Sequence, residues 1–133
     1  MPRVVWPLRH GQPAVDIVLT LAAGGQPIMR TLLADTGAGS SQSAFELILD
    51  EDDCLLCAGT AAVASIGLGG AYLGNFPLYT IFVQIPALNF AATLRAVGVP
   101  AVPPGVDGIA NFRFLNSFTY GNFGDPTQFG LEC

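Results

Sequence analysis

The pattern of hydrophobic and polar residues predicts β-strands along much of the chain. Residues 15–21 alternate between apolar and polar side chains, which is the period of a half-buried strand. A turn at residues 24–27 separates this run from a second apolar run at residues 28–34, so we expect a hairpin that ends at Asp35. Residues 78–85 are rich in β-branched and aromatic side chains and predict the clearest strand. Because helical signals are few, we expect a mainly β domain that is closed or folded on itself.

Several other segments have no decisive period. Residues 42–50 suit a strand or a helical turn, and residues 87–96 suit a strand or a short helix. Residues 1–13 contain three prolines and are expected to form an N-terminal arm that lies over the domain or a neighbour. The acidic run at residues 50–53 and the C-x-x-C segment at residues 54–57 are expected to form a loop, with the acidic run as its solvated tip.

Glycine and proline mark turns in the second half of the chain. Residues 60–66 are small and partly β-branched, and they lead into the sequence Gly-Leu-Gly-Gly at residues 67–70. These glycines suit the tip of a mobile hairpin or an ordinary turn, because glycine lets the backbone bend and approach a bound chain closely. Prolines within residues 100–104 mark a loop. Residues 119–133 are rich in glycine and aromatic side chains and suit a terminal strand.

Composition and charge narrow the range of partners. The 133 residues suit one domain, and a net charge of −5 with no lysine and five scattered arginines argues against nucleic acid as the main partner. The chain is 51% hydrophobic and only 11% charged, against about 25% charged in typical domains, so we expect a subunit interface to cover part of it. No apolar run predicts a membrane span and the N-terminus lacks the apolar core of a signal peptide, so we expect a cytoplasmic protein or part of a longer one.

Metal-binding side chains are too few to predict a metal site. Cys54 and Cys57 have C-x-x-C spacing, but a structural zinc site needs about four ligands, and His10 is the only histidine. The acidic run lacks the ligand spacing of an EF-hand. We therefore expect no metal and no cofactor. Cys54 and Cys57 are expected to be free thiols or an opportunistic disulfide. With Cys133 the chain has three cysteines, and an odd total fits a reducing compartment better than a disulfide framework.

The segment at residues 32–41 has the composition expected of a catalytic turn. An apolar run delivers one carboxylate, Asp35, into a turn of small residues. A half-buried carboxylate is costly unless hydrogen-bond donors surround it, and we expect Thr36, Gly37, Ser40 and Ser41 to supply hydroxyl and amide donors. The alternative is a plain turn with a solvated aspartate, because Asp and Gly are common in turns.

The turn formed by Asp35, Thr36, Gly37 and Ala38 resembles the active-site turn of aspartic proteases. The one-domain length is similar to that of the retropepsin-like branch, whose members form homodimers. This resemblance implies a retropepsin-like closed β-barrel in which Asp35 is catalytic and Thr36 braces the turn against its counterpart in the other subunit.

The glycine-rich segment extends the resemblance. Retropepsins carry a glycine-rich hairpin, the flap, downstream of the catalytic turn, and this hairpin closes over the bound peptide. Gly67, Leu68, Gly69 and Gly70 resemble that hairpin, which implies that they contact the substrate.

A second segment of aspartic proteases reads Asp-Gly, two apolar residues, Gly, and then a short helix that ends in an apolar pair. The matching residues here are Asp107, Gly108, Ile109 and Ala110, followed by the apolar pair at residues 114–115. Asn111 departs from the pattern because it stands where the family has glycine. Asn tolerates a left-handed backbone better than other non-glycine residues, so we expect the fold to accept it. The resemblance implies that this segment packs beneath the catalytic turn and that Asn111 could shift Asp35.

The resemblance covers about residues 14–120. It implies an N-terminal arm at residues 1–13, a protease domain at residues 14–120 and a C-terminal strand or tail at residues 121–133 that suits a dimer sheet. The implied function is an aspartic endopeptidase, a homodimer in which two Asp35 carboxylates activate water to cleave a peptide or protein substrate. The alternative is a non-catalytic domain of the same fold that dimerises or binds peptide. The sequence argues against a Ser/His/Asp hydrolase, because His10, the only histidine, lies in a proline-bordered arm and no Gly-x-Ser-x-Gly motif is present.

Overall fold

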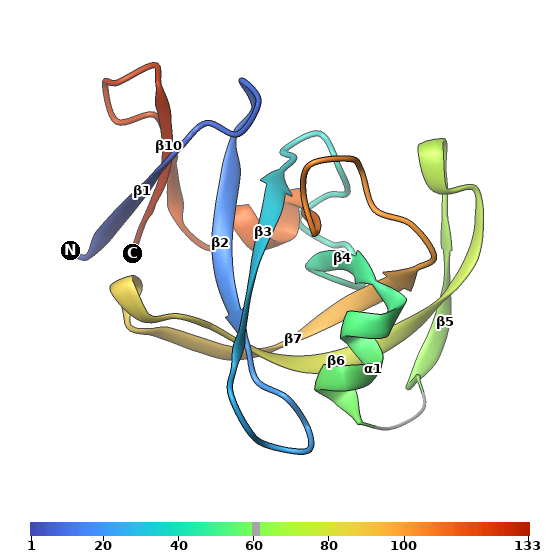
Figure 1. The fold of residues 1–133 in the computed structure, drawn as a ribbon. Coiled ribbons are helices and arrows are strands. Elements are labelled where there is room, and N and C mark those ends of the chain that lie inside the picture. The colour runs from blue at the N-terminus through green and yellow to red at the C-terminus, as the bar shows by residue number, and fades with distance from the viewer. Residues whose placement is uncertain (60–61) are drawn as a thin grey trace.

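The protein contains ten strands, two α-helices and two single-turn 3-10 helices within residues 1–59 and 62–133, the residues that its computed structural model describes (Figure 1). The strands are β1 (Arg3–Pro7), β2 (Ala14–Leu19), β3 (Ile28–Ala34), β4 (Leu47–Asp50), β5 (Ala64–Leu68), β6 (Gly74–Ile85), β7 (Phe90–Val99), β8 (Gly108–Ala110), β9 (Thr119–Gly121) and β10 (Gln128–Glu132). The α-helices are α1 (Glu51–Ala58) and α2 (Phe112–Leu115), and the 3-10 helices are η1 (Gly70–Tyr72) and η2 (Pro86–Leu88).

Six strands close into a barrel. Their order is β2-β3-β8-β4-β7-β6, and β6 pairs back with β2 at Val18↔Gln84 and Leu19↔Val83. Closure removes the unpaired edges that an open sheet would expose. β5 extends the sheet outside this ring by pairing with the first part of β6 (Figure 1). The predicted mainly β, closed fold is therefore confirmed.

The hairpin of β2 and β3 forms as its alternating pattern predicts. The two strands pair along their whole length, from Ala14↔Leu33 to Leu19↔Ile28. Val15, Ile17 and Leu19 on one face of β2 are fully buried in the barrel. Burial of a side chain of this size contributes roughly 1.5 to 3 kcal/mol relative to exposure, so the alternation fixes which face of the hairpin points inward.

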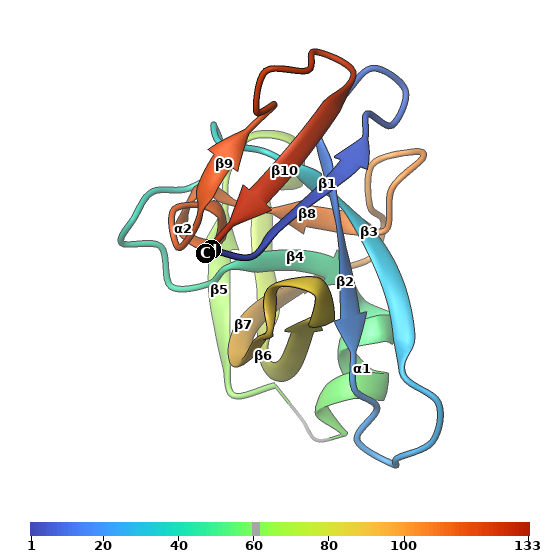
Figure 2. The same cartoon turned by 90° about the vertical axis from the view of Figure 1, so that its left-hand side faces the viewer.

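Strand β8 passes between β3 and β4 and connects them. It runs parallel to β3 and antiparallel to β4, so both of its edges are hydrogen-bonded (Figure 2). All three residues of β8 are buried. At its start the Thr31 amide donates to Asp107 Oδ2 at 2.9 Å, and the Asp107 amide donates to the Thr31 carbonyl at 2.8 Å. Asp107 therefore holds the entry of β8 against β3.

The two ends of the chain form a small separate sheet. β1 pairs with β10 and β10 pairs with β9, so β10 is the central strand and the chain ends lie together (Figure 2). Arg3 and Glu132 form a 2.8 Å ion pair across β1 and β10. Residues 1–13 thus include a regular strand, and residues 121–133 include a strand that pairs within its own chain.

The acidic run and the C-x-x-C segment form helix α1, so the predicted loop is wrong. Asp50 is the N-cap, and its side chain accepts a 2.9 Å bond from the Asp52 amide. Three acidic residues in the first turn interact favourably with the helix dipole, and Gly59 ends the helix in a left-handed conformation.

Asp53 is buried and not solvated, because the Arg30 guanidinium donates to both of its carboxylate oxygens at 2.7 and 3.0 Å. These bonds raise the pKa of Arg30. The fold has α1 in addition to the expected late helix.

The undecided segments are mostly strands. Residues 42–50 end in β4, and residues 87–96 fall mainly in β7 after the short η2. The strand predicted at residues 78–85 is confirmed and begins earlier, at Gly74. The run predicted at residues 60–66 starts outside the described residues, and β5 begins at Ala64.

We predict that Gly108→Ala destabilises the fold by roughly 3 kcal/mol, because the added methyl group has no space. A Cβ at Gly108 would overlap the Ile48 carbonyl oxygen and lie 2.9 Å from Leu49 Cδ2. The measurement is urea unfolding, with Gly69→Ala as the control because no atom lies within 4 Å of a Cβ at Gly69. Equal unfolding midpoints for the two variants would contradict the tight passage of β8 between its neighbours.

Candidate active site

Asp35 lies in a tight turn directly after β3. Its carboxylate oxygen Oδ1 accepts a 3.0 Å hydrogen bond from the Gly37 amide, and its carbonyl accepts a 3.1 Å bond from the Ala38 amide. Of the four donors expected from the sequence, Gly37 is the one that bonds the carboxylate within the described residues; the Ser40 hydroxyl instead accepts from Gln42. Asp35 is partly exposed, and Thr36 is exposed beside it. The Gly37 amide therefore fixes one oxygen of the carboxylate, and the carboxylate remains partly accessible to solvent.

The segment after β8 brackets this turn, as the sequence pattern predicts. The Asp35 amide donates to the Ala110 carbonyl at 3.0 Å, and the Phe112 amide donates to the Ala38 carbonyl at 2.9 Å. The first bond holds the start of the turn and the second holds its end. The orientation of the carboxylate thus depends on where residues 110–112 lie.

Asn111 is the N-cap residue of α2, and its backbone is not left-handed. Its φ and ψ are −85° and 179°, an extended conformation that needs no glycine. Its side chain is fully buried and uses both ends: Oδ1 accepts from the Phe114 amide at 3.1 Å, and Nδ2 donates to the Phe45 carbonyl at 2.7 Å. Asn is among the best N-cap residues because its side chain satisfies an amide that the helix leaves unpaired.

A cleft of about 510 Å³ joins three stretches that are far apart in the sequence. One wall is the turn after Asp35, the opposite wall is the glycine-rich hairpin, and Ile109 of β8 also lines it. The predicted residues in its lining are Asp35, Gly37, Ala38, Gly67, Leu68, Gly69, Gly70 and Ile109. The remaining lining residues, which the sequence did not indicate, are Gly39, Ser43, Phe45, Ile48 and Tyr72. Thr36, Asp107, Gly108, Ala110 and Asn111 lie outside this lining.

The glycine-rich segment leads into the tip of a β-hairpin: Gly67 and Leu68 lie in β5, and Gly69 and Gly70 begin the connection to β6. β5 and β6 pair up to Leu68↔Gly74, and residues 69–73 connect them. Near the tip, the Tyr72 and Phe76 rings meet edge to face with their centroids 6.4 Å apart, and Leu73 is 85% exposed. A Cβ at Gly69 would meet nothing within 4 Å. Gly69 and Leu73 at the tip therefore have open space around them, whereas Tyr72 packs against a buried hydrophobic cluster.

Apolar side chains and glycines make up most of the lining of the cleft, and Asp35, Ser43 and Tyr72 add polar groups. No other charged residue lines it within the described parts of the chain. Ile48 and Ile109 belong to a hydrophobic cluster that Leu68 and Tyr72 of the hairpin also contact. The cleft can therefore bind an extended apolar segment against its walls and present it to a carboxylate.

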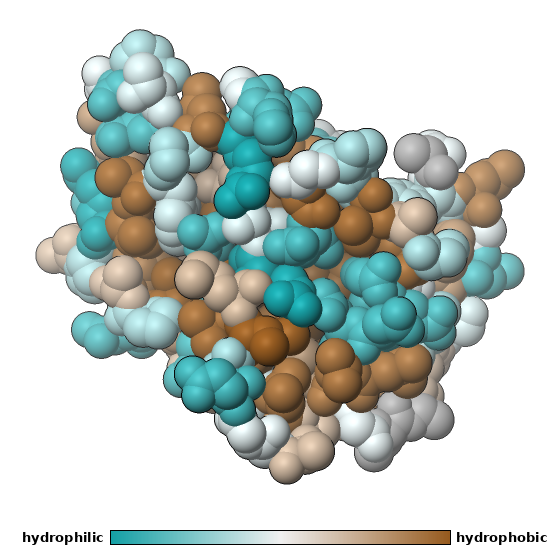
Figure 3. All heavy atoms as spheres, in the orientation of Figure 1, coloured by the Kyte–Doolittle hydropathy of each residue, from teal (hydrophilic) through white to brown (hydrophobic). Residues whose placement is uncertain are grey.

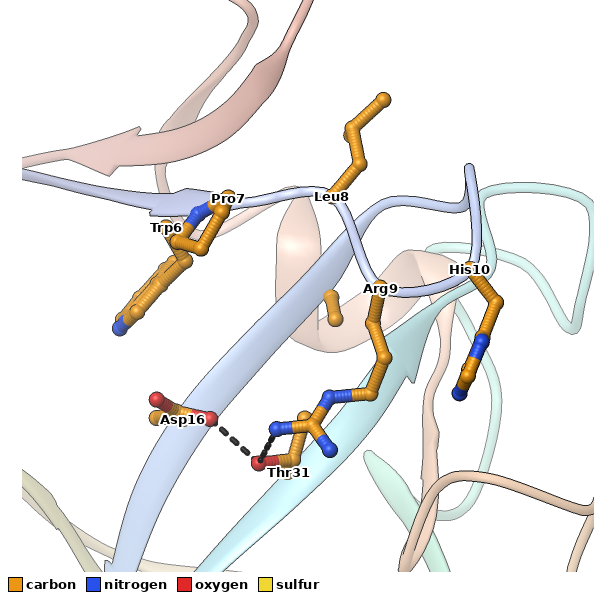
Figure 4. A pocket seen from close by; sticks show the side chains of 8 residues that line it. Trp6, Pro7, Leu8, Arg9, His10, Asp16 and Thr31 are labelled. Carbon is orange, nitrogen blue, oxygen red and sulfur yellow. Dashed lines mark hydrogen bonds between the residues drawn. The ribbon is translucent and has the colours of Figure 1, made fainter.

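A second cavity, of about 350 Å³, lies between the N-terminal segment and the β2–β3 hairpin (Figure 4). Arg9 Nη2 points toward Thr31 Oγ1 at 3.4 Å, and the Thr31 hydroxyl donates to Asp16 at 2.6 Å. Trp6 and His10 complete its rim. None of the predicted site residues lines this cavity, and no motif in the sequence marks it.

Residues 1–59 and 62–133 hold no cluster of three or more metal-ligating side chains. Within the same residues, no helix has the length and hydrophobicity needed to cross a membrane.

Cys54 and Cys57 are free and buried on α1, and Cys133 is free and exposed. Burial, together with the nearby Cys57 and Asp53, raises the pKa of Cys54 to about 12. Burial also raises the pKa of Cys57, so neither thiol has the character of a nucleophile.

Comparison with known proteins gives no match: no protein-family model fits the chain, and neither a curated protein nor a solved structure is similar to it. The assignment of a function therefore rests on the geometry of the cleft and on the chemistry of its residues.

We predict that a thiol-alkylating reagent at pH 8 modifies Cys133 in the folded protein and leaves Cys54 and Cys57 largely unmodified, because these two thiols are buried and protonated. Mass spectrometry of peptides would measure modification at each cysteine. The control is the chain in guanidinium chloride, where all three cysteines should react. Alkylation of Cys54 as fast as Cys133 in the folded protein would show that α1 is not docked on the barrel.

Proposed function

We propose that the protein is an aspartic endopeptidase of the retropepsin-like class that acts as a homodimer. The observation that best supports this proposal is the single cleft between the Asp35 turn and the glycine-rich hairpin, with the β8 segment behind the turn. A peptide in this cleft would lie between a carboxylate and a hairpin whose tip begins with two glycines. That is the arrangement needed for hydrolysis under a lid.

The need for a second copy follows from the count of carboxylates. The mechanism requires two of them facing one water, and Asp35 is the one acidic residue that lines the cleft within the described residues. The Asp107 carboxylate accepts a hydrogen bond from the Thr31 amide, and the Asp125 carboxylate accepts one from the Thr127 amide. A two-fold axis beside the exposed Thr36 would bring two Asp35 turns together, as closed dimers commonly do.

Large apolar side chains are exposed at several places on the surface. Hydrophobic and polar patches lie side by side on the face shown in Figure 3. Large apolar side chains with exposed fractions of 39% to 85% include Val5, Met29, Leu55, Leu56, Val63, Leu73 and Phe82. Partner binding would remove part of this apolar area from water, which favours association.

The proposed mechanism is general acid–base catalysis by the Asp35 pair. Two unit charges about 3 Å apart repel by roughly 5 to 6 kcal/mol at an effective dielectric constant of about 20, so the pair keeps one shared proton. The ionised carboxylate takes a proton from water while the water oxygen attacks the scissile carbonyl carbon. The protonated carboxyl donates to the carbonyl oxygen. The tetrahedral intermediate then collapses as the peptide nitrogen receives the proton that the first carboxylate took from water, and the amine leaves.

The proposed substrates are extended peptides with apolar residues beside the cleaved bond. Phe45, Ile48 and Ile109 offer apolar contacts, and no charged side chain other than Asp35 is available in the cleft to pair with a charged substrate residue. An unpaired charge in such a cleft would be costly.

The second candidate function is a non-catalytic domain that dimerises or binds peptide in the same cleft. Asn111 favours it, because this residue replaces the glycine of the protease pattern next to the catalytic turn. The two functions share a binding site and differ in whether the Asp35 pair activates water.

We predict that Asp35→Asn reduces peptide hydrolysis by roughly 1,000-fold or more, because it removes the base and leaves the shape of the site unchanged. Turnover of an unstructured protein should be measured from pH 3 to 8, with a maximum on the acid side of neutral. Asp52→Asn, on exposed α1, is the matched control and should behave as the parent. Sedimentation should show a dimer for all three proteins. Hydrolysis by Asp35→Asn at the parental rate would overturn the protease assignment in favour of peptide binding.

We predict that Gly69→Val slows hydrolysis roughly tenfold without lowering the melting temperature, because a β-branched residue stiffens the hairpin tip. Gly69 has an extended backbone with open space around it, so valine fits without strain. Ala64→Val, at the base of the same hairpin, is the control that leaves the tip unchanged. If both variants turn over substrate at the parental rate, the hairpin is not a lid.

A further inference from the structure

Asn111 is the only fully buried polar side chain among the described residues, and it lies immediately beneath the Asp35 turn. Its amide group joins two parts of the chain: Nδ2 donates to the Phe45 carbonyl before β4, and Oδ1 accepts from the Phe114 amide in α2. Its backbone adds a 3.1 Å bond from the Asn111 amide to the Glu46 carbonyl. The position of residue 111 is thus fixed from both sides.

The two residues next to Asn111 hold the turn. The Ala110 carbonyl accepts from the Asp35 amide, and the Phe112 amide donates to the Ala38 carbonyl. Any shift of residue 111 would move both of these bonds together, because they lie on adjacent peptide units. The carboxylate would move with them.

The side chain of Asn111 also lies close to Gly39, which follows the turn, and it bonds a residue of the cleft wall. A Cβ at Gly39, which has a φ of +73°, would lie 3.2 Å from Asn111 Nδ2 and 2.5 Å from Ser43 Oγ. Phe45, whose carbonyl Asn111 holds, lines the cleft. One buried amide therefore bonds the helix and the cleft wall and lies close to the turn.

We propose that Asn111 is a positioning residue that sets the place of the Asp35 carboxylate and of the Phe45 wall. The proposal rests on the proposed hydrolytic function for its effect on rate, and on the hydrogen bonds alone for its effect on the turn. It predicts the opposite effect of Asn111→Gly on the rate from the second candidate function, in which Asn111 marks a domain that has lost catalytic activity. A damaged site should recover when glycine is restored, whereas a site that uses Asn111 should become worse.

A glycine at position 111 would leave two polar groups without partners. The Phe45 carbonyl would lose its donor, and the Phe114 amide would lose its cap. Because residue 111 is fully buried, the turn would have to shift to admit water or would tolerate unpaired groups. A serine keeps a capping oxygen for Phe114 but is too short to replace the amide donor to Phe45.

The experiment compares Asn111→Gly, Asn111→Ser and the parent protein. Asn116→Ser is the matched control, since it makes the same change at the exposed C-cap of the same helix. We expect kcat to fall roughly 10- to 100-fold in both Asn111 variants, more in the glycine variant, because a misplaced catalytic group is costly. KM should change less than kcat. A kcat at or above the parental value in Asn111→Gly, with parental kcat in Asn111→Ser, would overturn the proposal.

Hydrogen exchange gives a second readout that needs no activity. In Asn111→Ser, the amides of Asp35 and Phe112 should lose protection while those of β6 and β7 in the barrel keep it. Parallel loss of protection at all of these amides would show general destabilisation and overturn the positioning role. If the parent protein cleaves no peptide, the proposed function fails, and hydrogen exchange still decides whether Asn111 positions the turn.

Discussion

The passage of β8 between β3 and β4 is the constraint on which the rest of the site depends. A strand that pairs on both edges must lie about 4.8 Å from each neighbour, and Gly108 meets this requirement because it has no side chain to exclude the Ile48 carbonyl. Once β8 is in place, Ile109 faces the cleft and the Ala110 carbonyl is directed at the Asp35 amide. Three buried residues thus align a strand end, a helix start and a carboxylate.

The parts of the fold that the sequence predicts are those with a local cause. The β2–β3 hairpin follows from alternation, the Asp35 turn from its small residues, and the short helix α2 from the pattern at residues 107–115. Helix α1 was not predicted because its acidic residues suggest a solvated loop. Its signals were present in an Asp at the N-cap and a Gly after the last turn, and they show that charge alone does not distinguish a loop from a first helical turn.

The cleft could be predicted only in part. Its charged residue and glycines belong to recognisable motifs, whereas Phe45 and Ile48 come from a segment without a decisive period. Ile48 reaches the cleft because β4 pairs with β8, more than 50 residues away in sequence, and no local pattern encodes that pairing. Asn111 shows a related limit. Its tolerance of a left-handed backbone explains why the fold could accept it, but it does not reveal the extended N-cap conformation, in which the side chain bonds the Phe114 amide.

The chain ends meet in one sheet, where β1 and β10 run side by side and the Cys133 amide donates to the Pro2 carbonyl. Any polypeptide attached at both ends would therefore leave from a single place on the surface. Such a unit can be inserted into a loop of another protein with little strain, because the host chain departs and returns at neighbouring points. The same closeness makes the protein suitable for circular permutation: a short linker could join the ends, and new ends could be opened in a surface turn.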